Sequence, residues 1–193
     1  MKYILIRKGK SFKMVGCILM LLMLLTVSYK TIDAAVYRLN VTKYTQEKSQ
    51  WCWAACAKMM GAYHGYNYSQ NTICKKAWGK VVDESLTLTA TTRVLKFTTK
   101  KNVKRSGVLS YKSFVTDMKG KRPRVLRMSW ISGKGHLYVV AGTKDASGPV
   151  QNALYLIDPE PGKASGYFSY SALKNGTTLA SGTGKYTNTW STL

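Results

Sequence analysis

The stretch QWCWAACAKMMGAY (50–63) predicts an α-helix with a cysteine in its first turn. Trp53 and Met60 are seven residues apart, on one helix face, and the run is rich in good helix formers. The unpaired N–H groups and the dipole at a helix start favour the thiolate form of a cysteine, which is its nucleophilic form. Cys52 lies at that start, whereas Cys56 lies about 6 Å deeper along the axis. Cys52 is therefore the candidate nucleophile.

Around this helix, the sequence predicts helices in the first half of the chain and strands in the second. Ser69 and Ser110 can cap two more helices, and the Thr-rich segment 83–101 fits either an irregular stretch or a short helix. Beyond residue 120 the apolar residues alternate, which is the period of β-strands. Helices are expected at 70–78 and 111–119, and strands at 102–108, 123–130, 136–142, 153–159, 166–170 and 185–190. This order predicts an α+β fold with an N-terminal helical lobe and a C-terminal antiparallel β-sheet lobe.

A nucleophilic cysteine needs a base, and the chain has two histidines. His64 lies twelve residues along the same helix, about 18 Å from the thiol, which leaves His136. If strands 136–142 and 153–159 pair around Ser147, His136 faces Asp158, so that the carboxylate can orient the imidazole. A bulge in the Gly148-Pro149 turn would shift this register by one residue. A cysteine at a helix start, with a histidine and an aspartate facing each other across a hairpin, is the arrangement that acyl-transfer chemistry needs.

These motifs carry a resemblance to papain-like cysteine proteases over about residues 37–193. The segment QWCWAAC resembles their nucleophile segment, KGHLYVVAG their Gly-His segment, and YLIDP the strand that bears the Asn or Asp partner. Gln46, six residues before Cys52, matches the glutamine whose amide helps to hold the oxyanion in that family. The chain looks most like the compact bacterial branch, which includes secreted effector proteases and bacteriocin-leader peptidases. The resemblance implies a papain-like fold with catalytic Cys52, His136 and Asp158, and Gln46 in the oxyanion hole.

The first 35 residues have the pattern of a secretory signal peptide. A head with five basic residues precedes 16 uncharged residues (14–29), and Ala34-Ala35 offers a cleavage site. The apolar run is shorter than the roughly 20 residues of a membrane span. The head RKGKSF (7–12) resembles those of some Gram-positive secreted proteins. We therefore expect a secreted bacterial protein whose peptidase domain spans 36–193.

Secretion bears on the remaining cysteines, because disulfides persist outside the cell. Cys56 and Cys74 lie on consecutive predicted helices that should pack together, so we expect a disulfide between them, with two free buried thiols as the alternative. A zinc site formed by Cys52, Cys56, His64 and Cys74 fits no common structural spacing, and we expect neither a metal nor a cofactor.

The chain carries 30 basic and 8 acidic residues, a formal charge of +22. Basic residues cluster in KFTTKKNVKR (96–105) and KGKRPR (119–124), and no nucleic-acid-binding motif accompanies them. Charged residues make up only 20% of the chain, which excludes a generic disordered tail. For an exported monomer, the expected partner of this basic face is an anionic cell-wall polymer or a membrane surface.

Two other classes of function stay open at this point. The same three residues serve transglutaminase-like acyltransferases and cell-wall amidases, although those families usually lack the Trp-Ala-Ala helix start with a glutamine six residues upstream. A catalytically silent basic toxin or adhesin is the non-enzymatic alternative. The expected substrate is a peptide or protein.

Overall fold

The computed structural model describes residues 35–146 and 151–193. The predicted signal peptide, apart from its last residue, lies outside these described residues, as does the Gly148-Pro149 turn. Within the described part, no helix has the length and apolar character needed to cross a membrane.

Three helices lie between strands β1 (Val36–Arg38) and β2 (Val103–Ser106): α2 (Cys52–Tyr63), α3 (Gln70–Trp78) and α4 (Leu88–Thr99). The Ser69 side chain caps α3 by accepting a hydrogen bond from the N–H of Thr72 at 3.0 Å. The ambiguous Thr-rich segment is helical because Thr87 caps it in the same way and its apolar residues Val94 and Leu95 are buried. Two further helices, α5 (Tyr111–Lys119) and α6 (Tyr170–Asn175), lie within the second half of the fold.

An antiparallel sheet forms the other lobe. Its strands are β1 (Val36–Arg38), β2 (Val103–Ser106), β3 (Arg124–Trp130), β4 (Gly135–Lys144), β5 (Ala153–Ile157), β6 (Gly166–Ser169), β7 (Thr177–Leu179) and β8 (Gly182–Thr192). The order is β2-β8-β3-β4-β5-β6, with β1 added to β4 and β7 to β8. The C-terminal strand β8 therefore lies inside the sheet, between β2 and β3.

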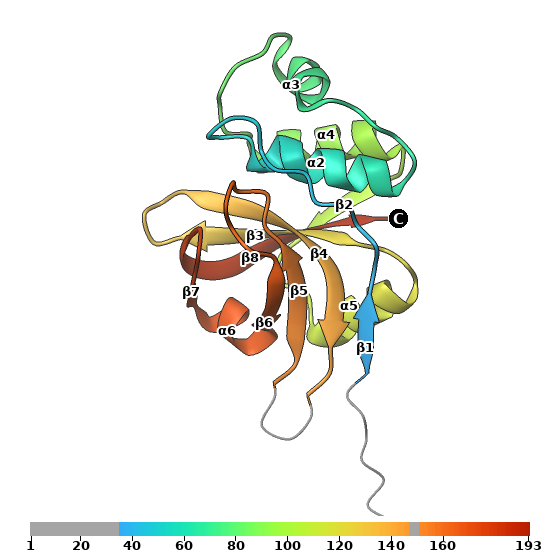
Figure 1. Ribbon diagram of the computed structural model, residues 1–193, viewed down its shortest axis with the longest axis vertical. Helices are drawn as coiled ribbons and strands as arrows, with labels where there is room; N and C mark the ends of the chain where they lie inside the picture. The colour runs from blue at the N-terminus through green and yellow to red at the C-terminus, as the bar shows by residue number, and fades with distance from the viewer. Residues whose placement is uncertain (1–34, 147–150) are drawn as a thin grey trace, which may run out of the picture. The chain divides into compact units, whose positions relative to one another are not determined.

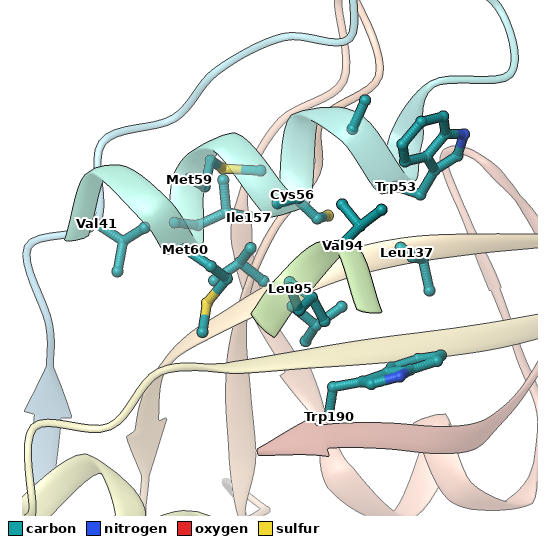
Figure 2. Close-up of a cluster of buried hydrophobic side chains, with 14 of the residues drawn as sticks. Val41, Trp53, Cys56, Met59, Met60, Val94, Leu95, Leu137, Ile157 and Trp190 are labelled. Atoms are coloured by element: carbon teal, nitrogen blue, oxygen red, sulfur yellow. The ribbon is translucent and has the colours of Figure 1, made fainter. Parts of the chain in front are cut away.

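Each face of the sheet packs against helices. On one face, α2 and α4 form a core with the sheet that includes Trp53, Met60, Leu95, Leu137 and Trp190 (Figure 2). On the other face, α5 and α6 pack onto a second apolar cluster. Figure 1 shows α3 on the outer side of α2 and α4, away from the sheet. The α+β architecture with a helical lobe and an antiparallel sheet lobe is confirmed.

The β4–β5 hairpin has a different register from the predicted one. Val139 pairs with Ile157, so that continuing this register would place Tyr138, and not His136, opposite Asp158. The pairing shifts by one residue between Val140 and Gly142, which is a bulge within β4. The predicted pairing of His136 with Asp158 across the ladder is therefore wrong.

Candidate active site

Cys52 is the first residue of α2 and its side chain is partly exposed. Trp51 occupies the cap position without a side-chain cap, and no acidic residue lies in the first turn. The first N–H groups of the helix consequently keep their capacity to bind an acceptor from outside it. The structure therefore has Cys52 at the start of a helix, as predicted.

The loop around residues 82–84 holds this helix start in place. The indole N–H of Trp51 donates to the carbonyl oxygen of Val82 at 2.7 Å, and that of Trp53 donates to the carbonyl oxygen of Glu84 at 3.0 Å. The Asp83 carboxylate accepts hydrogen bonds from the backbone N–H of Gln50 at 2.9 Å and from the Ser49 hydroxyl. Both tryptophans next to the thiol thus serve to position α2.

His136 and Asp158 form a buried pair. His136 is near the start of β4, Asp158 follows the last residue of β5, and His136 Nε2 lies 2.8 Å from Asp158 Oδ1. The carboxylate also accepts hydrogen bonds from the Glu160 N–H at 2.9 Å and from the Ser181 hydroxyl. Burial acts to raise the pKa of Asp158, but the hydrogen bonds from His136, Ser181 and Glu160 outweigh it and hold the pKa below its ordinary value. Asp158 is therefore present as a carboxylate.

The imidazole of His136 is set up to carry a proton. Burial acts to lower its pKa, but the hydrogen bond to Asp158 and the nearby Cys52 thiol, together with the charges of both groups, raise the pKa to about 9. Since Nε2 faces Asp158, Nδ1 is the nitrogen available to the thiol. Trp130 stacks against the ring at 6.5 Å between centroids, and Tyr138 contacts it edge-on at 4.8 Å. The structure thus brings the three predicted catalytic residues together.

A cavity of about 320 Å³ lies beside Cys52 and His136. One wall comes from the chain before and within the first turn of α2 and from the segment leading into α4, and the other from β3 and the β3–β4 turn. Its lining includes Ser49, Gln50, Trp53, Arg127, Lys134 and Leu137. The cavity can hold part of a peptide next to the thiol.

Gln46 lies close to this site but is turned toward its own loop. Its Nε2 donates hydrogen bonds to the carbonyl oxygens of Lys48 at 3.1 Å and Ser49 at 2.9 Å. The side chain is buried, its Oε1 has no partner among the described residues, and Gln46 is absent from the cavity lining. To donate a hydrogen bond to an oxyanion, Gln46 Nε2 has to give up its hydrogen bond to one of these two carbonyl oxygens.

The other two described cysteines are free thiols. Cys56 is fully buried in the core beneath α2 (Figure 2), and burial, followed by the charges of Cys52 and Asp158, raises its pKa well above the ordinary value. The Cys74 thiol instead contacts the loop after α3, where it lies 3.4 Å from the Val82 carbonyl oxygen. The predicted Cys56–Cys74 disulfide is therefore wrong for this structure, because α2 and α3 pack together but the Cys74 side chain turns to the loop.

Among the described residues, one group has the composition and spacing to hold a metal ion: the donor atoms of His136, Asp158 and Glu160 lie within 4.8 Å of one another. The imidazole and carboxylate of this group already bond to each other. The four residues considered for a zinc site are not such a group, and His64 lies at the far end of α2 as its C-terminal cap.

Ser181 is a residue of this site that the sequence did not reveal. It lies in the turn before β8, 23 residues after Asp158, and it is part of the short segment ASGTG with no motif of its own. Its contact with Asp158 arises from the tertiary fold, which brings the β7–β8 turn to the end of β5.

A helical lobe and an antiparallel sheet that meet at a thiol, an imidazole and a carboxylate define the class of papain-like cysteine peptidases. The family model for peptidase family C70, described as papain-like cysteine protease AvrRpt2, matches residues 35–174, and the chain belongs to this family. The expected resemblance and the expected enzyme class, a cysteine peptidase, are thereby confirmed.

Solved structures show the same fold at low sequence identity. A C39-like peptidase from Bacillus anthracis superposes with a TM-score of 0.55 at 11% identity, over 82% of this chain and 98% of that chain. The peptidase domain of Streptococcus ComA, a bifunctional ABC transporter of a quorum-sensing pathway, has a TM-score of 0.53 at 15% identity, over 81% of this chain and 99% of that chain. No curated protein matches the sequence.

Proposed function

We propose that the protein is a secreted cysteine peptidase that cleaves peptide bonds through Cys52, with His136 as its base. The observation that carries this proposal is the position of the His136 imidazole, which bonds to the Asp158 carboxylate through Nε2 and lines the same cavity as Cys52 at the start of α2. The open cavity next to the thiol gives a peptide access to it. Membership of a papain-like protease family supports the same reaction.

The geometry supports a two-step acyl transfer. His136 takes the proton of the Cys52 thiol, and the thiolate attacks the scissile carbonyl carbon to form a tetrahedral intermediate. The backbone N–H of Cys52 stabilises its oxyanion, together with the Gln46 amide once that amide has turned away from the loop carbonyls. His136 then protonates the leaving amine, which leaves a thioester on Cys52. A water molecule deprotonated by His136 hydrolyses this thioester and restores the free thiol.

Incubation with a papain-type epoxide inhibitor and peptide mapping tests the accessible thiol and the reaction class together. We expect the label on Cys52 and none on Cys56 or Cys74, because those two side chains are buried. We also expect a protein substrate to gain new amino termini without an added amine, and the labelled enzyme to produce none.

The outcomes of this experiment separate the alternatives. Turnover only in the presence of an added amine would indicate a transglutaminase-like acyltransferase. Cleavage of amide bonds in cell-wall material, without cleavage of any protein substrate, would indicate an amidase. An unlabelled Cys52 in a folded protein would indicate a silent basic toxin or adhesin.

We further propose that the protein is exported and that its basic face binds an anionic wall polymer or membrane surface. The support is the signal-peptide pattern of residues 1–35 and a set of exposed cations on α4 and the segment after it. These are Lys96, Lys100, Lys101, Lys104 and Arg105. Within the second basic cluster, Arg124 is buried against Asp117 and is not part of this face.

Amino-terminal sequencing of the protein from the culture medium and from a salt wash of the cells tests both statements. We expect the chain to begin at Ala35 or Val36, and high salt to release a cell-associated fraction, since salt screens exposed charges. A secreted chain that begins at Met1 would contradict cleavage, and a salt wash without the protein would contradict surface binding.

A further inference from the structure

A guanidinium without an acidic partner lines the cavity beside Cys52. Arg127 lies on β3 opposite Leu137 of β4, and its side chain is half-buried. The ion pairs among the described residues involve the carboxylates of Asp117 and Asp158, and none includes Arg127. Its charge is therefore not neutralised by a carboxylate of the described part of the chain, and a buried charge without such a partner is costly.

The Arg127 side chain is held in one orientation. Its Nη1 donates hydrogen bonds to the hydroxyls of Ser129 and, at 3.3 Å, of Thr187. Neither of these partners carries a charge, and Nε and Nη2 have no acceptor among the described residues. The guanidinium is thus fixed through Nη1, while the N–H groups of Nε and Nη2 stay available. Two such N–H groups in one plane can donate to both oxygens of a carboxylate.

This guanidinium lies next to the proposed base. A Cβ atom added to Gly135 would meet Arg127 Nη2 at 2.5 Å and Cζ at 2.7 Å, so the guanidinium covers the residue that directly precedes His136. Because Gly135 has no side chain, the Arg127 guanidinium can lie directly against its backbone. A substrate group bound to Arg127 would lie within a few residues of the scissile bond.

The charges around the cavity favour an anion on this side. The described residues that line it include the cations Arg127 and Lys134 and no acidic residue. Two carboxylates bond to residues of the lining: Asp83 accepts hydrogen bonds from Ser49 and Gln50 on the helical side, and Asp158 is bonded to His136. Little competes within the cavity for a carboxylate at Arg127.

We propose that Arg127 is a specificity-determining residue that binds a carboxylate of the substrate, and that the substrate is a peptide with an acidic side chain close to the scissile bond. This inference rests on the proposed peptidase function and adds the substrate class to it. A C-terminal carboxylate of the peptide has the same chemistry, and the experiment distinguishes the two sources.

The test compares peptides that differ by glutamate or glutamine at one position within three residues on either side of the cleaved bond. We expect wild type to prefer glutamate at one of these positions by about 10- to 100-fold in kcat/KM, the range of a hydrogen-bonded charge pair. Arg127→Gln should bring this ratio close to one, and Arg127→Lys should keep part of it. The matched control is Arg38→Gln, which removes the same charge from an exposed position on β1 and should leave the ratio unchanged. A peptide pair ending in an acid or an amide identifies a preference for the chain terminus.

Three results would overturn the inference: a ratio near one at every position in wild type, a ratio that Arg127→Gln does not change, or a preference for the terminal acid alone. Binding of the same peptides to Cys52→Ala keeps the inference separate from the peptidase proposal. If wild type cleaves no peptide but Cys52→Ala binds the glutamate peptide through Arg127, the carboxylate site stands and the peptidase proposal fails. If neither cleavage nor binding depends on Arg127, the carboxylate site fails.

Discussion

Substitution of Cys52 by serine or of His136 by alanine should lower kcat/KM on a peptide substrate by about 10⁴-fold or more, by analogy with enzymes in which nucleophile and base act as one unit. Cys52→Ser replaces the thiol with a hydroxyl, which a histidine base activates far less readily because the pKa of an alcohol is much higher. His136→Ala removes the proton acceptor between the thiol and Asp158. The measurement is kcat/KM on one fluorogenic peptide for each variant.

His64→Ala is the matched control for loss of a histidine. His64 caps the far end of α2, and burial, followed by the charge of Lys101, lowers its pKa. This variant should keep the activity of wild type within about threefold, a change of barrier near 0.7 kcal/mol. Thermal melting of all three variants checks that each one is folded. A folded Cys52→Ser or His136→Ala enzyme with undiminished activity would contradict the proposed mechanism.

The sequence predicts those parts of the site that local pattern controls. The helix start at Cys52 follows from a run of helix formers with one apolar face, and the structure begins α2 at that residue. The contact between His136 and Asp158 also exists, although the predicted register is wrong. The contact forms despite the different register because Asp158 lies just beyond the last residue of β5. At that position the side chain need not follow the alternation of faces that strand residues obey.

The remaining features depend on tertiary contacts that no local pattern encodes. The bulge in β4 shifts the hairpin by one residue at Ala141, and the neighbouring Gly142, a lone glycine within a strand, does not by itself specify the size of such a shift. Cys56 and Cys74 lie on the neighbouring helices α2 and α3, but the packing of the two helices does not determine where each thiol points. Ser181 and Arg127 reach the site through the β7–β8 turn and through β3, far from Cys52 in the sequence. The Thr-rich α4 is helical because Thr87 caps its start and its apolar face is buried, while the Thr91 and Thr99 hydroxyls find acceptors in carbonyls of the preceding turn.

The second large effect is expected at Asp158. Asp158→Ala should lower kcat/KM by about 10- to 100-fold, because orienting partners of this kind typically contribute that factor and the ring is then free to turn. Asp158→Asn should retain more activity, since the amide oxygen can still accept the hydrogen bond from the imidazole N–H. The Glu160 N–H can continue to donate to that oxygen, and the Ser181 hydroxyl can accept from the new amide N–H. The measurement is kcat/KM for both variants, with thermal melting as a control.

The pH profile separates orientation of the ring from simple loss of stability. Asp158 raises the pKa of His136 toward about 9 by accepting its hydrogen bond and by its negative charge, so its removal must lower that pKa. The reactive pair of thiolate and imidazolium exists only below the pKa of the imidazolium, so activity is lost as the pH rises through it. The alkaline limb of kcat/KM should therefore move to lower pH in Asp158→Ala, and by less in Asp158→Asn if its amide still fixes the ring. A purely structural Asp158 would leave this limb in place, and an alanine variant within threefold of wild type with an unmoved limb would remove Asp158 from the catalytic site.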